Sequence, residues 1–230
     1  MYRKISEYLA EWKESPNRKP LILQGARQVG KTYALLEFGR NNYDNVAYFN
    51  FETDPKLADT FAENISPAYL LPILSHIAGT TIVSEKTLII LDEVQLCERA
   101  LTSLKYFCEE APQYHIIVAG SLLGVAVNRK QFSFPVGKVD IKTMYPMDME
   151  EFLLALGKEA LVKEIRNHFE DDTPMPSALH DSAMQLYRQY LIVGGMPECV
   201  QQFAQTKDYL LVRHTQDTIL LGCRDPAIGV

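Results

Sequence analysis

The sequence predicts an α/β fold with a parallel sheet, followed by a small all-helical region. Up to about residue 145, short apolar runs alternate with amphipathic stretches. This alternation is typical of a parallel sheet covered by helices on both faces. After Tyr145-Pro146 the apolar residues recur at helical spacing. We therefore predict two domains, a core at 1–146 and a helical appendage at 147–230.

The predicted strands of the core are short and mostly apolar. They read PLILQG (20–25), VAYFNFE (46–52), TLIILDE (87–93), HIIVAGS (115–121) and KVDIKTM (138–144). The last strand alternates apolar and polar residues, so we expect it to be more exposed than the others. The predicted core helices lie at 2–14, 31–41, 55–64, 67–78 and 99–111, and the appendage has four helical stretches with a loop at 171–176.

Composition narrows the class of protein. The 23 basic and 29 acidic residues give a net charge of −6, so the average surface does not attract nucleic acid or an anionic membrane. No run reaches the roughly 18 apolar residues of a membrane span, and the N-terminus lacks the apolar stretch of a signal peptide. The cysteines show no CxxC or CxxH spacing, which predicts neither a zinc site nor a disulfide framework. We expect a cytoplasmic protein.

The segment GARQVGKT at 25–32 matches the phosphate-binding pattern G-x-x-x-x-G-K-[ST] at every fixed position. Gly25 and Gly30 allow the backbone to turn tightly and aim its N–H groups at phosphates. Lys31 places a charge at the β- and γ-phosphates, and Thr32 offers a hydroxyl to Mg²⁺. The strand before and the helix after supply the required context. The predicted nucleotide-binding residues are Gly25, Ala26, Arg27, Gln28, Val29, Gly30, Lys31, Thr32 and Tyr33.

A second motif, LIILDE, ends a buried strand in two acids. Asp92 fits the carboxylate that holds Mg²⁺ together with Thr32. Glu93 fits the residue that aligns and deprotonates the attacking water, although an acid there also suits the start of a helix. Ser121 closes the next strand and faces either the γ-phosphate or a following helix that it caps. The predicted catalytic residues are therefore Lys31, Glu93 and Ser121.

These segments occur in order with FPVGKVDIKTMYPMDMEEFL and YLIVGGMPECV, and together they resemble a prokaryotic AAA-type family of P-loop ATPases. The resemblance covers roughly residues 3–222. It implies a sheet with an additional strand, in which the Ser121 strand lies between the P-loop strand and the Asp92 strand. It also implies ATP as the nucleotide and a polar sensor role for Ser121. The family has a basic residue at the position of Lys138, and the alternative is that Lys138 is a solvated lysine at the start of a strand.

The same resemblance implies a chain about twice this length, with a C-terminal domain of which most is expected to be missing here. Three further features stay open. Arg27 lies in the loop and points either to phosphate or to solvent. The Arg129-Lys130 pair is either an arginine finger acting on a neighbouring copy or a solvated turn. Gly194-Gly195 is either a hinge or a plain turn between helices.

Three functions compete at this point. The first is an ATPase that couples Mg²⁺-ATP hydrolysis to movement of the helical appendage, and the acids at 92 and 93 favour it. The second is a nucleotide-dependent switch or scaffold with little turnover. The third is a small-molecule kinase. The acids at 92 and 93 fit attack by water better than phosphate transfer to a small molecule. The partner is a second copy of the chain or an unknown protein, and net charge gives no support to nucleic acid.

Overall fold

A computed structural model describes residues 1–121 and 135–224, and the chain divides into two compact units. The core unit comprises Ile5–Ala26 and Gly30–Met144. The helical unit comprises Met1–Lys4, Arg27–Val29 and Tyr145–Val230. The two are described separately below.

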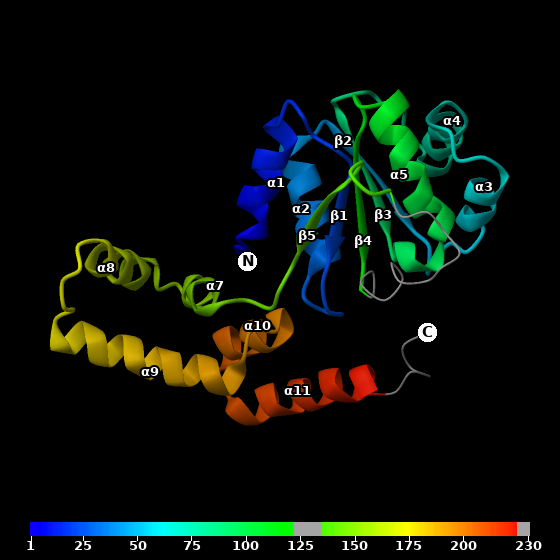
Figure 1. The fold of residues 1–230 in the computed structure, drawn as a ribbon. Coiled ribbons are helices and arrows are strands. Elements are labelled where there is room, and N and C mark those ends of the chain that lie inside the picture. Colours follow the sequence, from blue (N-terminus) through cyan, green and yellow to red (C-terminus); the bar gives the residue numbers. More distant parts are fainter. Residues whose placement is uncertain (122–134, 225–230) are drawn as a thin grey trace. The chain divides into compact units, whose positions relative to one another are not determined.

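The core unit is built on a parallel sheet with the order β2-β3-β4-β1-β5 among the described residues (Figure 1). The strands are β1 (Leu21–Gln24), β2 (Asn45–Asn50), β3 (Thr87–Asp92), β4 (His115–Gly120) and β5 (Asp140–Thr143). Strand β4, which Ser121 follows, lies between the P-loop strand β1 and the Asp92 strand β3. The predicted fold class and its additional-strand order are therefore confirmed.

Helices cover both faces of this sheet, and β3 and β4 are therefore buried along their whole length. Helices α3 (Leu57–Glu63), α4 (Pro67–Ala78) and α5 (Glu98–Glu110) pack on one face (Figure 1). Phe61 and Phe107 are among the largest side chains buried there. Helices α1 (Ile5–Glu14) and α2 (Lys31–Asn42) cover the other face. Strand β5 lies at the sheet edge and is partly exposed, as its alternating sequence predicts.

The ends of several elements differ from the prediction, and those of β3 and β4 concern the site. Strand β3 ends at Asp92, because Glu93 turns out of the strand with φ 52° and ψ 41° and begins the short helix η1 (Val94–Leu96). Strand β4 ends at Gly120, so Ser121 follows the strand instead of closing it. Helix α1 begins at Ile5 and not at residue 2.

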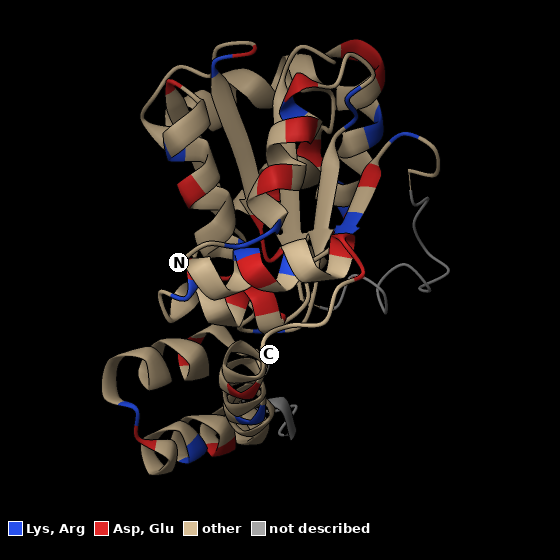
Figure 2. Cartoon of the chain, turned by 90° about the vertical axis from the view of Figure 1, so that its left-hand side faces the viewer, with Lys and Arg blue, Asp and Glu red and all other residues tan. Residues whose placement is uncertain are grey.

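The helical unit contains α7 (Met149–Ala155), α8 (Glu159–Glu170), α9 (Ser177–Val193), α10 (Pro197–Thr206) and α11 (Tyr209–Arg224). An apolar cluster joins α7, α9, α10 and α11, with Phe152 stacked on Phe203. Acidic and basic residues are interspersed in both units (Figure 2). Within the described ranges, no helix combines the length and the apolar character that a membrane span requires.

A buried histidine in the core unit predicts acid sensitivity. His115 begins β4, is 4% exposed, and its Nδ1 lies 2.7 Å from the Tyr43 hydroxyl. Burial lowers the pKa of His115 to about 4, and the charges of Arg18 and Lys13 act in the same direction. The folded chain therefore favours the neutral ring. The stability that this ring contributes is complete above the unfolded pKa of 6.5 and is lost as the pH falls from there toward 4.

We expect wild type to lose on the order of 2 kcal/mol more unfolding free energy than His115→Gln between pH 7 and pH 4.5. Urea unfolding of both proteins at the two pH values measures this difference. Equal losses in the two proteins would show that His115 does not titrate in this range.

Candidate nucleotide-binding site

The predicted phosphate loop lies between β1 and α2, so it has the strand before and the helix after that the motif requires. Gly30 adopts the left-handed conformation with φ 90° and ψ 25°, which explains the glycine at this position. Gln28 also has a positive φ of 63°. Because Gly30 carries no side chain, the first turn of α2 has no side-chain cap. A helix start without a cap is suited to bind an anion.

Lys31 folds back over the beginning of the loop. Its Nζ donates to the carbonyl oxygens of Gly25 at 3.0 Å and Ala26 at 2.8 Å, and the residue is only 7% exposed. The ammonium group is thus held beside the backbone of the loop whose N–H groups are expected to bind phosphate. This position suits a point charge that stabilises a bound polyphosphate.

Asp92 lies opposite Thr32, although 60 residues separate them in the chain. The carboxylate is 1% exposed. Its Oδ2 accepts hydrogen bonds from Thr32 Oγ1 at 2.6 Å and from Tyr48 Oη at 2.9 Å. Its Oδ1 accepts from the backbone N–H of Glu93 at 3.0 Å. The fold therefore brings together the two residues that the sequence proposes as metal ligands.

Thr32 and Asp92 fit Mg²⁺ in their chemistry. Both present oxygen, which this hard cation prefers, and their oxygens are close enough to share one ion. Among residues 1–121 and 135–224 there is no group of three or more His, Cys, Asp or Glu that could hold a metal by itself. A set of two protein ligands completed by phosphate and water is the usual arrangement for Mg²⁺ at nucleotide sites.

Glu93 occupies an unusual backbone conformation beside this carboxylate. A left-handed φ is uncommon outside glycine and is often found at functional sites. Glu93 stands at the N-cap position of η1, but its side chain makes no capping hydrogen bond. Its Oε2 instead accepts a hydrogen bond from Gln95 Nε2. Glu93 therefore stands at a helix start, as the alternative interpretation has it, but its carboxylate does not cap the helix.

Sequence reasoning missed Tyr48 and Asn50, which support Asp92 from β2. Asn50 Nδ2 donates to Tyr48 Oη at 3.1 Å, and Tyr48 donates onward to Asp92. Burial and the nearby charges of Asp92 and Glu93 raise the pKa of Tyr48 to about 12, against the opposing hydrogen bond from Asn50. The hydroxyl therefore stays protonated at neutral pH. The available signal was the two-residue spacing of Tyr48 and Asn50 at the end of a strand paired with the Asp92 strand.

The family assignment agrees with this geometry. Residues 17–153, more than half of the chain, match the model of an AAA domain. The chain belongs to this AAA domain family. This family agrees with the AAA-type resemblance that the sequence predicted. None of the curated proteins compared with it matches the sequence.

The solved structures that match this AAA protein have low sequence identity to it. PCH-2 of C. elegans is 11% identical with a TM-score of 0.48, over 90% of this chain and 63% of that one. AMPPCP-bound DnaA of Aquifex aeolicus is 13% identical with a TM-score of 0.47, over 92% and 63%. The Aeropyrum pernix ORC2 protein is 15% identical with a TM-score of 0.44, over 70% and 52%. The chain therefore spans about half to two thirds of the length of these structures.

The other residues that the sequence singled out in this AAA protein differ in exposure and contacts. Ser121 directly follows β4 and is half-buried, while the helix it was predicted to cap lies outside the described residues. Lys138 is half-exposed and forms an ion pair with Glu109 at 2.9 Å. Arg27 is half-buried, and Tyr33 is 57% exposed. The Arg129-Lys130 pair lies outside the described residues.

Proposed function

We propose that this AAA protein binds Mg²⁺-ATP and hydrolyses it. The observation that carries the proposal is the buried Asp92 carboxylate, hydrogen-bonded to Thr32 of the P-loop helix and followed directly by Glu93. A metal-binding acid and an acid suited to act on water thus stand side by side at the end of β3. Phosphoryl transfer needs little beyond positioning and charge stabilisation, and these residues provide both.

Lys31 and the loop backbone bind the triphosphate in this mechanism. Nζ of Lys31 now donates to two loop carbonyls. A bound nucleotide exchanges part of this contact for the β- and γ-phosphates, to which an ammonium bonds more strongly. The uncapped start of α2 adds partial positive charge at the same point.

Thr32 and Asp92 would hold the metal, whose role when bound is to neutralise charge on the β- and γ-phosphates. Tyr48 keeps the Asp92 carboxylate oriented through its hydroxyl. Glu93 orients the attacking water and accepts its proton. The hydrogen bond from Gln95 to Oε2 makes this carboxylate less basic, so losing it would favour proton transfer from water.

That hydrogen bond also favours a second candidate, a nucleotide-dependent switch with little turnover. While Gln95 occupies Oε2 of Glu93, the carboxylate has less capacity to accept a proton from water. ATP would then bind without rapid hydrolysis until a second copy or another protein moves Gln95. In the first proposal ATP turnover is coupled to movement of the helical unit, and in the second bound ATP orders a surface for a partner.

Lys31→Ala tests the nucleotide site itself. We expect its affinity for Mg²⁺-ATP to fall by roughly 100-fold or more, because a charged donor to the phosphates is lost. Equilibrium titration with a fluorescent ATP analogue measures the change, and Lys105→Ala, an exposed lysine on α5, is the matched control. Equal affinity in Lys31→Ala and wild type would remove the P-loop from the proposal. Phosphate release without an added acceptor separates hydrolysis from kinase activity.

A further inference from the structure

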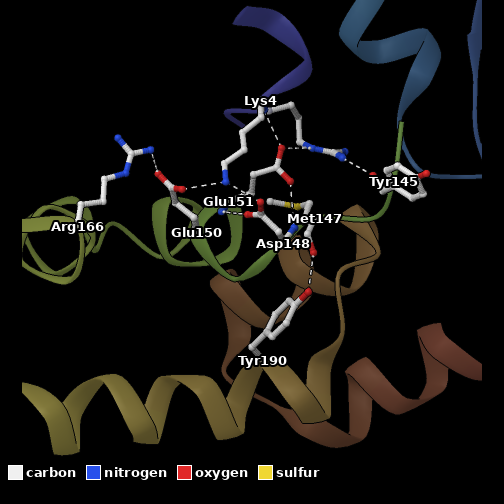
Figure 3. A network of polar contacts seen from close by, with 9 residues as sticks. Lys4, Tyr145, Met147, Asp148, Glu150, Glu151, Arg166 and Tyr190 are labelled. Atoms are coloured by element: carbon white, nitrogen blue, oxygen red, sulfur yellow. Dashed lines mark hydrogen bonds and ion pairs between the residues drawn. The ribbon is translucent and has the colours of Figure 1, made fainter. Parts of the chain in front are cut away.

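An N-terminal pair of basic residues is fixed to the start of α7 in the helical unit. Lys4 forms ion pairs with Asp148 at 2.6 Å and Glu150 at 2.8 Å, and Glu150 also pairs with Arg166 (Figure 3). The backbone N–H of Lys4 donates to Glu151 Oε1 at 2.7 Å. Asp148 and Glu151 in turn complete a capping box at the start of α7.

Arg3 makes a different set of contacts, with one carboxylate and two backbone carbonyls. The residue is 6% exposed and Glu151 is 4% exposed. Arg3 Nε donates to Glu151 Oε1 at 3.0 Å, Nη1 to the carbonyl of Val29 at 2.7 Å, and Nη2 to the carbonyl of Tyr145 at 2.7 Å. Of these partners, Val29 lies in the phosphate loop, directly before Gly30 and Lys31. One guanidinium thus joins the P-loop backbone to α7.

The contact with Val29 has a consequence for phosphate binding. In a planar trans peptide, the C=O of one residue and the N–H of the next point in opposite directions. The carbonyl that Arg3 holds belongs to the peptide whose N–H is that of Gly30. Fixing the oxygen of Val29 therefore fixes the direction of the Gly30 N–H, one of the amides that the motif aims at phosphate.

We propose that Arg3 is a positioning residue that pre-orients the Val29–Gly30 peptide of the phosphate loop, with Glu151 holding its guanidinium in place. This inference rests on the proposed nucleotide-binding function and adds a residue outside the motif. The geometry requires arginine, because three acceptors in different directions are bonded by three nitrogens of one planar group. A buried ion pair is weak evidence for stability but suits a role in fixing one conformation.

Arg3→Lys is the decisive variant, because it keeps a positive charge beside the buried Glu151. A single ammonium cannot reproduce the three-way contact of the guanidinium. We expect Arg3→Lys to bind ATP and ADP roughly 10-fold more weakly than wild type. Turnover at saturating ATP should stay within about twofold, because the Gly30 N–H contacts phosphate in both the ground and transition states. Equilibrium titration and kcat measurements on the full chain give both values.

Lys4→Gln is the matched control, since it breaks the neighbouring exposed ion pairs and leaves Arg3 unchanged. We expect wild-type nucleotide affinity in this control. Wild-type affinity in Arg3→Lys, or equal losses in the two variants, would overturn the positioning role. If Arg3→Lys fails to fold, the double variant Arg3→Gln/Glu151→Gln leaves no unpaired buried charge and should show the same loss, whereas wild-type affinity in it would overturn the role.

Lys31→Ala in the same titration separates this inference from the proposed function. If wild type binds nucleotide and Lys31→Ala does not, the nucleotide site stands, and the Arg3 variants alone decide the positioning role. If wild type binds no nucleotide, both the proposed function and the role of Arg3 are overturned.

Discussion

Glu93→Gln is expected to bind Mg²⁺-ATP with nearly wild-type affinity but to lose hydrolysis by about 10²- to 10⁴-fold in kcat, the usual contribution of a general base. Glutamine has the size of glutamate and can still bond to neighbouring groups, but it cannot take a proton from water. The backbone N–H of residue 93 will continue to donate to Asp92. Binding should therefore survive while the chemical step fails. Phosphate release and nucleotide titration on one preparation give the two values.

Glu110→Gln makes a matched control for this variant. Glu110 is an exposed carboxylate at the end of α5 in the same unit, so the substitution makes the same change in charge away from the site. It should hydrolyse ATP at the wild-type rate. A Glu93→Gln protein that turned over as fast as Glu110→Gln would show that another group handles the water.

Gly195→Ala is expected to lower the unfolding free energy by about 3 kcal/mol, the effect of overpacking a site with no room for an added carbon. A Cβ at this position would lie 2.1 Å from the carbonyl oxygen and 2.9 Å from the nitrogen of Met147. Both are backbone atoms, and Met147 N–H donates to the Gly195 carbonyl at 2.7 Å. Neither backbone segment can therefore move away without breaking this hydrogen bond. Urea unfolding of the variant and wild type measures the change.

Gly222→Ala provides the control for backbone entropy. Gly222 lies within α11, and a Cβ there would meet no atom within 4 Å. This change should leave stability unchanged or raise it by about 1 kcal/mol, since alanine favours the helix. Equal stability in Gly195→Ala and wild type would mean that the contact with Met147 can relax.

The sequence predicted those parts of the site that follow from local patterns. The P-loop residues and Asp92 are recognised by their spacing and by the buried strands that precede them. The proximity of Thr32 and Asp92 then follows from the strand order, because parallel strands end at one edge of the sheet. Strand order itself came from the family resemblance, since hydrophobic runs do not say which strands are neighbours.

What the sequence could not predict are contacts made by single side chains across the fold. The two-residue spacing of Tyr48 and Asn50 places both side chains on one face of their strand, but it does not identify Asp92 as the partner, because a tyrosine is common in any strand. The contacts of Arg3 with Val29 and Glu151 span 26 and 148 residues. The strand ending at Asp92 was also predicted one residue too long, because a left-handed glutamate leaves no sequence signal.

Phosphate release from Mg²⁺-ATP by the wild-type chain, followed beside Glu93→Gln with nucleotide binding measured in parallel, tests the proposed hydrolysis most directly. We expect wild type to bind ATP and release phosphate without any added acceptor, while Glu93→Gln binds and does not release it. Tight ATP binding by wild type with no phosphate release would contradict hydrolysis by this chain and leave the nucleotide-dependent switch as its function.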